Sequence, residues 1–116
     1  MLPAGKIRLR LILAPGLVLG PGKIDLLAGI QDTGSISAAG RAMGMSYKKA
    51  WSLIDALNRG FRQPLVETIK GGKAGGGARL TDSGQTVLAR YRELEKRAQK
   101  QFSAEITAFD DLVRPQ

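Results

Sequence analysis

The sequence predicts a mainly α-helical domain with a small β component and a long C-terminal helix. Two observations support this prediction. Apolar residues recur at helical spacing over most of the chain, and two short β-prone runs flank a stretch with five glycines, Gly71 to Gly77. The chain has 116 residues, 43% of them apolar, which is enough for one packed core. We divide it into a body, residues 1–81, and a C-terminal helix with a tail, residues 82–116.

The N-terminal half is predicted to begin with a strand or small hairpin and to continue as three helices. Charged and apolar residues alternate from Lys6 to Leu13, and a second apolar run, Leu17 to Leu19, follows the turn residues Pro15-Gly16. Gly34 can end the first helix with a positive φ, Ser35 or Ser37 can cap the second, and Ser46 can cap the third. The predicted helices are Pro21–Thr33, Ser37–Met43, and one from Ser46 to about Phe61.

The C-terminal half is predicted to contain a β-hairpin and one long helix. The strands are Leu65–Ile69 and Ala78–Leu80, and Thr81 caps a helix from Asp82 to about Leu112. This helix would be about 46 Å long, whereas the body would be only about 30 Å across. Its apolar stripe would therefore overhang the body and pair with a second copy, giving a homodimer. The stripe residues are Val87, Tyr91, Leu94, Ala98, Phe102, Ile106, Phe109 and Val113. The alternative is a helix that bends back or frays after Ala98 and leaves a monomer.

Composition excludes several kinds of chemistry. The chain has no cysteine and no histidine, which excludes disulfides, cysteine nucleophiles, histidine acid–base pairs and the usual zinc sites. The first 80 residues hold only four acids, on separate predicted elements, so a carboxylate-based hydrolase or nuclease is the least favoured alternative. These acids are Asp25, Asp32, Asp55 and Glu67. We therefore expect a protein that is not an enzyme and needs no cofactor or metal.

Positive charge is concentrated in the body. Residues 1–80 carry 12 basic and four acidic residues, whereas residues 81–116 carry six of each, so the body accounts for the whole net charge of +8. Such a small, basic unit typically binds a polyanion or an anionic surface. The apolar run from Leu11 to Leu19 is broken by Pro15-Gly16 and is too short to span a membrane. We therefore expect a cytoplasmic protein with no membrane partner.

The second and third predicted helices, joined by Gly44-Met45, match a helix-turn-helix. In that motif the N-terminal residues of the second helix enter the major groove of DNA and meet base edges and phosphates. Here they carry hydroxyl and ammonium groups: Ser46, Tyr47, Lys48, Lys49 and Ser52. We expect Tyr47, Lys48 and Ser52 to govern sequence choice, while the sequence leaves open whether Lys49 meets phosphate or solvent. For Trp51, packing is favoured over contact with DNA. The plainer alternative is a helix pair with a solvated charged face.

The glycine-rich stretch between the predicted strands fits a wing that lies close to DNA. Glycine lets the backbone approach the duplex, and Lys70, Lys73 and Arg79 would supply phosphate contacts. A nucleotide-binding loop would need Ser or Thr after the Gly-Lys pair and a following helix, but Ala74 follows Lys73 and a strand is predicted next. A solvated hairpin loop is the remaining alternative.

Three motifs together give a family resemblance over about residues 5–112. They are the Ser-Ile-Ser run, the Ser-Tyr-Lys-x-Ala-Trp run and the Gly-Gly-Lys-x-Gly-Gly-Gly stretch, which start at Ser35, Ser46 and Gly71. The chain resembles the N-terminal DNA-binding domain of the molybdate-responsive ModE regulators and, more distantly, the LysR-type winged helix. The resemblance implies a winged helix-turn-helix that dimerises through its last helix. It also implies DNA binding at the matching residues, to which it adds Ser35 and Ser37. Full-length relatives sense molybdate or tungstate in C-terminal domains that these 116 residues lack, so we do not expect this chain to sense either ion.

The sequence therefore predicts a small sequence-specific transcription regulator that binds a pseudo-palindromic operator in double-stranded DNA as a homodimer. Whether a separate protein supplies a sensor is left open. The alternative from another class is a protein-interaction module that uses the basic face and the C-terminal helix.

Overall fold

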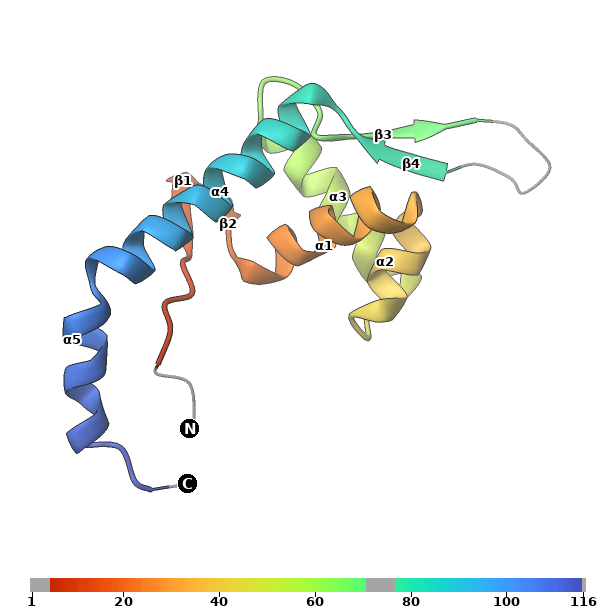
Figure 1. The fold of residues 1–116 in the computed structure, drawn as a ribbon. Coiled ribbons are helices and arrows are strands. Elements are labelled where there is room, and N and C mark those ends of the chain that lie inside the picture. Colours follow the sequence, from red (N-terminus) through yellow and green to blue (C-terminus); the bar gives the residue numbers. More distant parts are fainter. Residues whose placement is uncertain (1–4, 71–76, 116) are drawn as a thin grey trace.

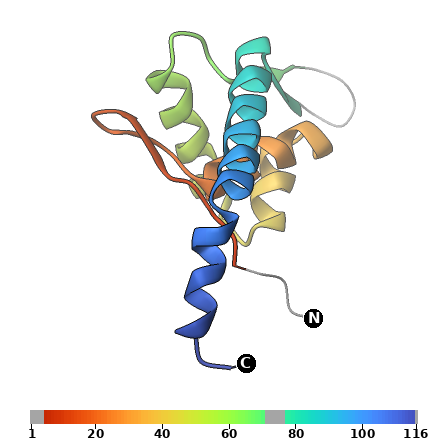
Figure 2. The same ribbon diagram turned by 60° about the vertical axis from the view of Figure 1, so that its left-hand side comes forward.

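The computed structural model describes residues 5–70 and 77–115. Three helices form a body, and an antiparallel hairpin projects from it at each of two places (Figure 1). A fourth helix crosses the body and leads away from it into a short helical tail (Figure 2). The elements are β1 (Leu11–Ala14), β2 (Leu17–Leu19), α1 (Pro21–Thr33), α2 (Ile36–Ala42), α3 (Tyr47–Gly60), β3 (Val66–Ile69), β4 (Gly77–Leu80), α4 (Asp82–Gln101), α5 (Ser103–Thr107) and a 3-10 turn (Ala108–Asp111).

The ends of the first three helices confirm the predicted caps. Gly34 has φ 71° after α1, and its N–H donates to the Ile30 carbonyl. Ser35, one of the two predicted candidates, caps α2: its Oγ accepts from the Ala38 N–H at 3.0 Å, so that α2 begins at Ile36. The Ser46 Oγ accepts from the Lys49 N–H at 3.1 Å and starts α3.

The core lies where α1, α2 and α3 meet the β3–β4 hairpin. Small residues bring the helices close together: a Cβ on Gly40 would lie 2.7 Å from the Ala50 Cβ, and a Cβ on Gly29 would lie 2.9 Å from the Ala39 Cβ. Helix α2 therefore presents a small surface to its neighbours. The largest fully buried side chains are Leu26, Leu27, Ile30, Ile54, Leu57 and Leu65.

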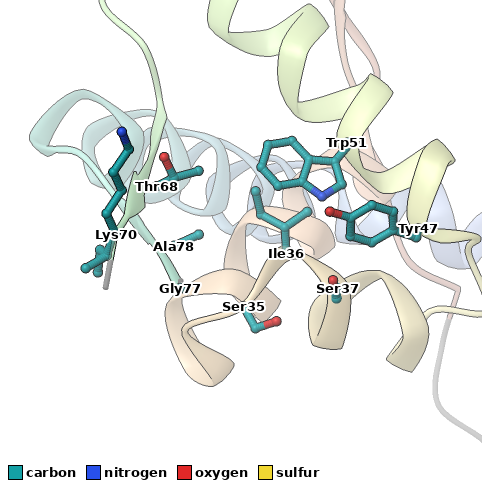
Figure 3. Close-up of a pocket in the computed structure, with 10 residues that line it drawn as sticks. Ser35, Ile36, Ser37, Tyr47, Trp51, Thr68, Lys70, Gly77 and Ala78 are labelled. Carbon is teal, nitrogen blue, oxygen red and sulfur yellow. The ribbon is translucent and has the colours of Figure 1, made fainter. Parts of the chain in front are cut away.

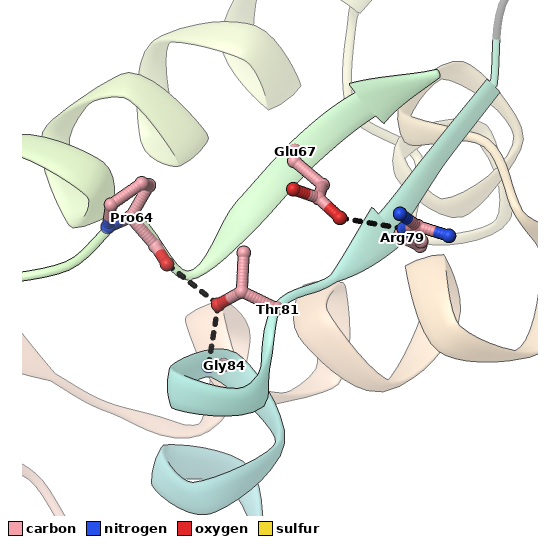
Figure 4. A network of polar contacts seen from close by, with 5 residues as sticks. All are labelled: Pro64, Glu67, Arg79, Thr81 and Gly84. Carbon is pink, nitrogen blue, oxygen red and sulfur yellow. Dashed lines mark hydrogen bonds and ion pairs between the residues drawn. The ribbon is translucent and has the colours of Figure 1, made fainter.

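The start of α4 is fastened to the start of β3 (Figure 4). The Thr81 hydroxyl accepts from the Gly84 N–H at 3.0 Å and donates to the Pro64 carbonyl at 2.6 Å. The Thr81 N–H donates to the Leu65 carbonyl at 2.9 Å. A Cβ on Gly84 would lie only 2.1 Å from that carbonyl oxygen, so this approach requires glycine.

The prediction of one continuous helix from Asp82 to about Leu112 is wrong. Helix α4 ends at Gln101, where Phe102 adopts φ −110° and ψ 18°, and the chain continues as α5 and the 3-10 turn in another direction (Figure 1). Four residues from this point on, Phe102, Ile106, Thr107 and Phe109, are weak helix formers, because aromatic and β-branched side chains lose rotamer freedom in a helix. In addition, the Ser103 Oγ hydrogen-bonds the Lys100 carbonyl at 3.3 Å, which competes with helical bonding.

The N-terminal segment departs from its prediction in a similar way. The predicted small hairpin around Pro15-Gly16 is confirmed, because Leu11–Ala14 pairs with Leu17–Leu19, but the first strand is shorter than the alternating run, and residues 5–10 run extended beside α4. The Ile7 N–H donates to the Gln99 Oε1 at 2.6 Å, and the Tyr91 hydroxyl donates to the Leu9 carbonyl. Burial and the nearby Glu95 carboxylate raise the pKa of Tyr91, which keeps this donor protonated. Side chains of α4 thus bind the polar backbone groups that a partner strand would otherwise bind.

Candidate nucleic-acid interface

The exposed surface of α3 divides into three lines of residues. Each residue advances about 100° around a helix, and Ala50, Ile54 and Leu57 point into the core. The line opposite the core, which we call the central stripe, lies in a shallow, open depression on α3. The central stripe consists of Lys48, Ser52, Asp55 and Arg59. Tyr47 and Trp51 lie on one side of it and Lys49 and Leu53 on the other.

On the Tyr47 side, α3 faces the β3–β4 hairpin across an open cleft of about 370 Å³, which we call the wing cleft (Figure 3). Tyr47 and Trp51 border one end, and Lys70 lies at the other (Figure 3). The wing cleft is lined by Ser35, Ile36, Ser37, Tyr47, Trp51, Thr68, Ile69, Lys70, Gly77 and Ala78. It therefore brings together predicted DNA-contacting residues from α2, α3 and the hairpin.

The position of the hairpin beside the wing cleft is fixed by backbone contacts. The Ala78 N–H donates to the Gly34 carbonyl at 2.9 Å. A Cβ on Gly77 would lie 2.9 Å from the same oxygen, so the backbones come as close as glycine permits. The distance between the hairpin and the N-terminus of α2 is therefore set by the protein itself.

Trp51 both packs and lines the wing cleft. Its ring is partly buried against the core, in agreement with the packing interpretation. It meets the Tyr47 ring edge-on, with centroids 6.0 Å apart and an interplanar angle of 61°. Its indole Nε1 is buried and has no hydrogen-bond partner among the described residues. Tyr47 is 63% exposed, so its ring covers Trp51 and still faces solvent.

One predicted phosphate contact of the wing, Arg79, stands apart from this cluster. Strand residues alternate between faces, so Thr68 and Ala78 face the wing cleft while Glu67 and Arg79 face the other way. The Arg79 Nε donates to the Glu67 Oε1 at 2.6 Å (Figure 4). Lys73 lies outside the described residues.

The remaining predicted contacts belong to the caps and to the far side of α3. Ser35 and Ser46 use their hydroxyl oxygens as cap acceptors, and each O–H keeps its own proton to donate. Lys49 lies with Leu53 in a second open cleft, of about 380 Å³, which we call the basic cleft. Arg10 and Lys23 also line it, and neither residue was predicted from the sequence to contact DNA. No sequence signal joins these three residues, because each comes from a different segment of the chain.

The predicted dimerisation stripe is divided by the structure. Tyr91 is 2% exposed and belongs to the core, and Val87 packs against that core. By contrast, Leu94, Phe102 and Phe109 are 44%, 47% and 62% exposed. Ala98 and Ile106 are half-buried. Leu112 and Val113 extend the exposed apolar surface to the tail.

No group of three or more acidic residues among the described ones could hold a metal ion. Among these same residues, no helix is long and apolar enough to cross a membrane.

Helices α1 to α3 with the β3–β4 hairpin define a winged helix-turn-helix domain. Residues 22–85 match the model of the bacterial regulatory helix-turn-helix proteins of the lysR family. The chain therefore belongs to this family.

Curated relatives include ModE proteins, in agreement with the resemblance to the ModE regulators. The chain is 45% identical to the molybdenum-pterin-binding protein MopB of Rhodobacter capsulatus, over 77% of this chain and 33% of that protein. It is 44% identical to the molybdenum transport protein ModE of Azotobacter vinelandii, over 69% and 30%. It is 41% identical to the DNA-binding transcriptional dual regulator ModE of Escherichia coli (strain K12), over 93% and 40%. These matches confirm the resemblance to ModE, and the chain spans about a third of the length of these relatives.

Solved structures support the fold. A CbnR_DBD–DNA complex matches with a TM-score of 0.57 and 19% identity, covering 74% of this chain and 93% of that one. The multiple antibiotic resistance repressor MarR matches with a TM-score of 0.58 and 14% identity, covering 81% and 72%.

Proposed function

We propose that this protein is a transcription regulator that reads duplex DNA with helix α3. The observation that carries the proposal is the central stripe: Lys48 and Ser52 stand on the exposed face of α3, near its N-terminus, beside a cleft lined by predicted contact residues. An α-helix fits the major groove, which is about 12 Å wide, and its N-terminal residues reach base edges there. The body's excess of basic residues favours the same partner.

In this proposal the central stripe reads bases and the wing cleft holds one sugar–phosphate strand. Lys70 supplies an ammonium group and Ser37 a hydroxyl donor. Tyr47, which the sequence predicts to govern base choice, borders this cleft, so in this proposal its hydroxyl donates to the same strand. Arg79 contributes little, because its guanidinium is already paired with Glu67 on the opposite face of the hairpin.

We propose further that the regulator acts as a homodimer. The apolar surface of Leu94, Phe102 and Phe109 is too exposed to stabilise the single chain, and burying such side chains is worth about 1.5–3 kcal/mol each. A second copy related by a two-fold axis would cover it. The two α3 helices would then meet half-sites about 34 Å apart, or a multiple of that distance, in a pseudo-palindromic operator.

The test begins by selecting duplexes from a random pool with the full chain and deriving the preferred site. Lys48→Ala and Ser52→Ala are then compared with the wild-type protein on this site and on random DNA. We expect each variant to lose about 1–3 kcal/mol on the preferred site and less on random DNA. Lys96→Ala, an exposed lysine of α4, is the matched control and should bind like the wild-type protein. Failure of the wild-type chain to bind any duplex at low salt would overturn the proposal.

A further inference from the structure

We infer that the basic cleft binds the second phosphate strand that borders the major groove, on the side of α3 away from the wing. This inference rests on the proposed function and extends it to Arg10 and Lys23. The basic cleft is lined by Arg10, Val18, Gly20, Pro21, Gly22, Lys23, Met45, Lys49 and Leu53.

The position of the basic cleft follows from the rotation of α3. Lys49 is two residues after Tyr47 and two residues before Trp51. Measured around the helix across the central stripe, it lies about 200° from Tyr47 and about 160° from Trp51. The wing cleft and the basic cleft therefore flank the central stripe from nearly opposite sides. A helix in the major groove has a phosphate strand on each side. The wing cleft serves one strand, and the basic cleft is placed to meet the other.

The chemistry of the basic cleft fits a phosphodiester. Three cationic side chains line it, and none of the described residues lining it is acidic. Lys23 donates one N–H to the Val18 carbonyl at 2.7 Å, which orients its ammonium group and leaves two N–H donors. Asp25, the acid nearest to Lys23 in sequence, is 3.5 Å from the Arg8 guanidinium and does not line the cleft.

The position of Arg10 is set by contacts on both sides of it in the chain. The preceding carbonyl, that of Leu9, accepts a hydrogen bond from Tyr91, and the following residue, Leu11, pairs with Leu19 in the hairpin. A Cβ on Gly20 would lie 3.9 Å from the Arg10 Cγ, so the stem of the arginine runs along the start of α1. Holding the backbone in place lowers the entropy lost when the guanidinium meets an anion.

The experiment is phosphate-ethylation interference on the selected duplex, using the full chain. In the wild-type complex we expect interference at phosphates on both sides of each major-groove half-site. Arg10→Gln and Lys23→Gln should each weaken interference on the side away from the wing only. Lys70→Ala should give the complementary pattern. Each of the three variants should also lower the slope of log K against log salt by about 0.9, with little change in sequence preference.

Arg8→Gln is the matched control, since it removes the same charge from the same segment at a residue paired with Asp25. It should keep both sets of phosphates and the wild-type slope. If Arg10→Gln and Lys23→Gln also bind with wild-type slope and pattern, the inference is overturned and the proposed function stands. If they lose cognate binding alone, the cleft reads bases and the inference is also overturned. If the wild-type chain binds no duplex, both fail together.

Discussion

Replacing Gly84 by alanine tests how α4 is joined to the body. The added Cβ would lie 2.1 Å from the Leu65 carbonyl oxygen, whereas unbonded carbon and oxygen atoms keep about 3.3 Å apart. Helix α4 or the start of β3 must therefore move by about 1 Å. That movement strains the Thr81 N–H bond to the same carbonyl and the cap that Thr81 forms on the Gly84 N–H.

The competing effects can be compared in magnitude. Forcing an extra carbon into a packed site costs about 1–3 kcal/mol, and loss of a cap costs about 1 kcal/mol. Against this, alanine is favoured over glycine within helices by up to about 1 kcal/mol. We therefore expect Gly84→Ala to lower the free energy of unfolding by about 1–3 kcal/mol. With a urea m-value of roughly 1.5 kcal/mol/M, its midpoint should fall by about 1 M.

Gly22→Ala provides the matched control in α1. A Cβ on Gly22 would meet no atom within 4 Å, so only the helical preference for alanine remains, and we expect a slightly higher midpoint. The same substitution should thus change stability in opposite directions at the two sites. A Gly84→Ala midpoint equal to or above that of the wild-type protein would refute the reasoning.

Three further predictions concern other contacts. Asn58→Ala should lower the free energy of unfolding by about 1–3 kcal/mol in urea melts, because the Asn58 side chain accepts from two backbone N–H groups and donates to a carbonyl at the start of β3; an unchanged midpoint would contradict this role. Phe102→Glu combined with Phe109→Glu should convert the dimer to a monomer in sedimentation and make the unfolding midpoint independent of protein concentration, and a wild-type chain that sediments as a monomer at micromolar concentration would contradict the dimer. Glu67→Gln should free Arg79 and steepen the salt dependence of DNA binding by up to about one unit, whereas an unchanged slope would mean that Arg79 reaches no phosphate even when unpaired.

The sequence predicted the features that depend on neighbouring residues. Thr81 and Ser46 begin helices because a hydroxyl satisfies an N–H three residues away, and Gly34 ends a helix because glycine tolerates a positive φ. These interactions are complete within one turn of chain. The DNA-contacting residues proposed on α3 follow from the same local logic.

The features that the sequence did not predict depend on distant contacts or on small energy differences. At Phe102, the regular spacing of apolar residues favours a continuous helix, whereas the weak helix formers that follow disfavour it. The spacing alone does not show which of the two effects is larger. Strand alternation places Ala78 and Arg79 on opposite faces, but only the packed structure identifies the face toward α3. The basic cleft could not be predicted, because nothing in the sequence shows that Arg10 lies beside α3.

The extended N-terminal segment gives the proposed dimer a fixed spacing. Tyr91 and Gln99 of α4 bind the backbone of residues 5–9, so that Arg10 keeps a constant distance from α4. In a dimer joined through α4 and its tail, the protein fixes the separation of the two Arg10 side chains in the absence of DNA. One extra base pair between half-sites moves the second half-site by about 3.4 Å and turns it by about 34°. With such an operator, only one subunit at a time could contact its outer phosphates. The regulator would therefore distinguish operators by the spacing of their half-sites as well as by their base sequence.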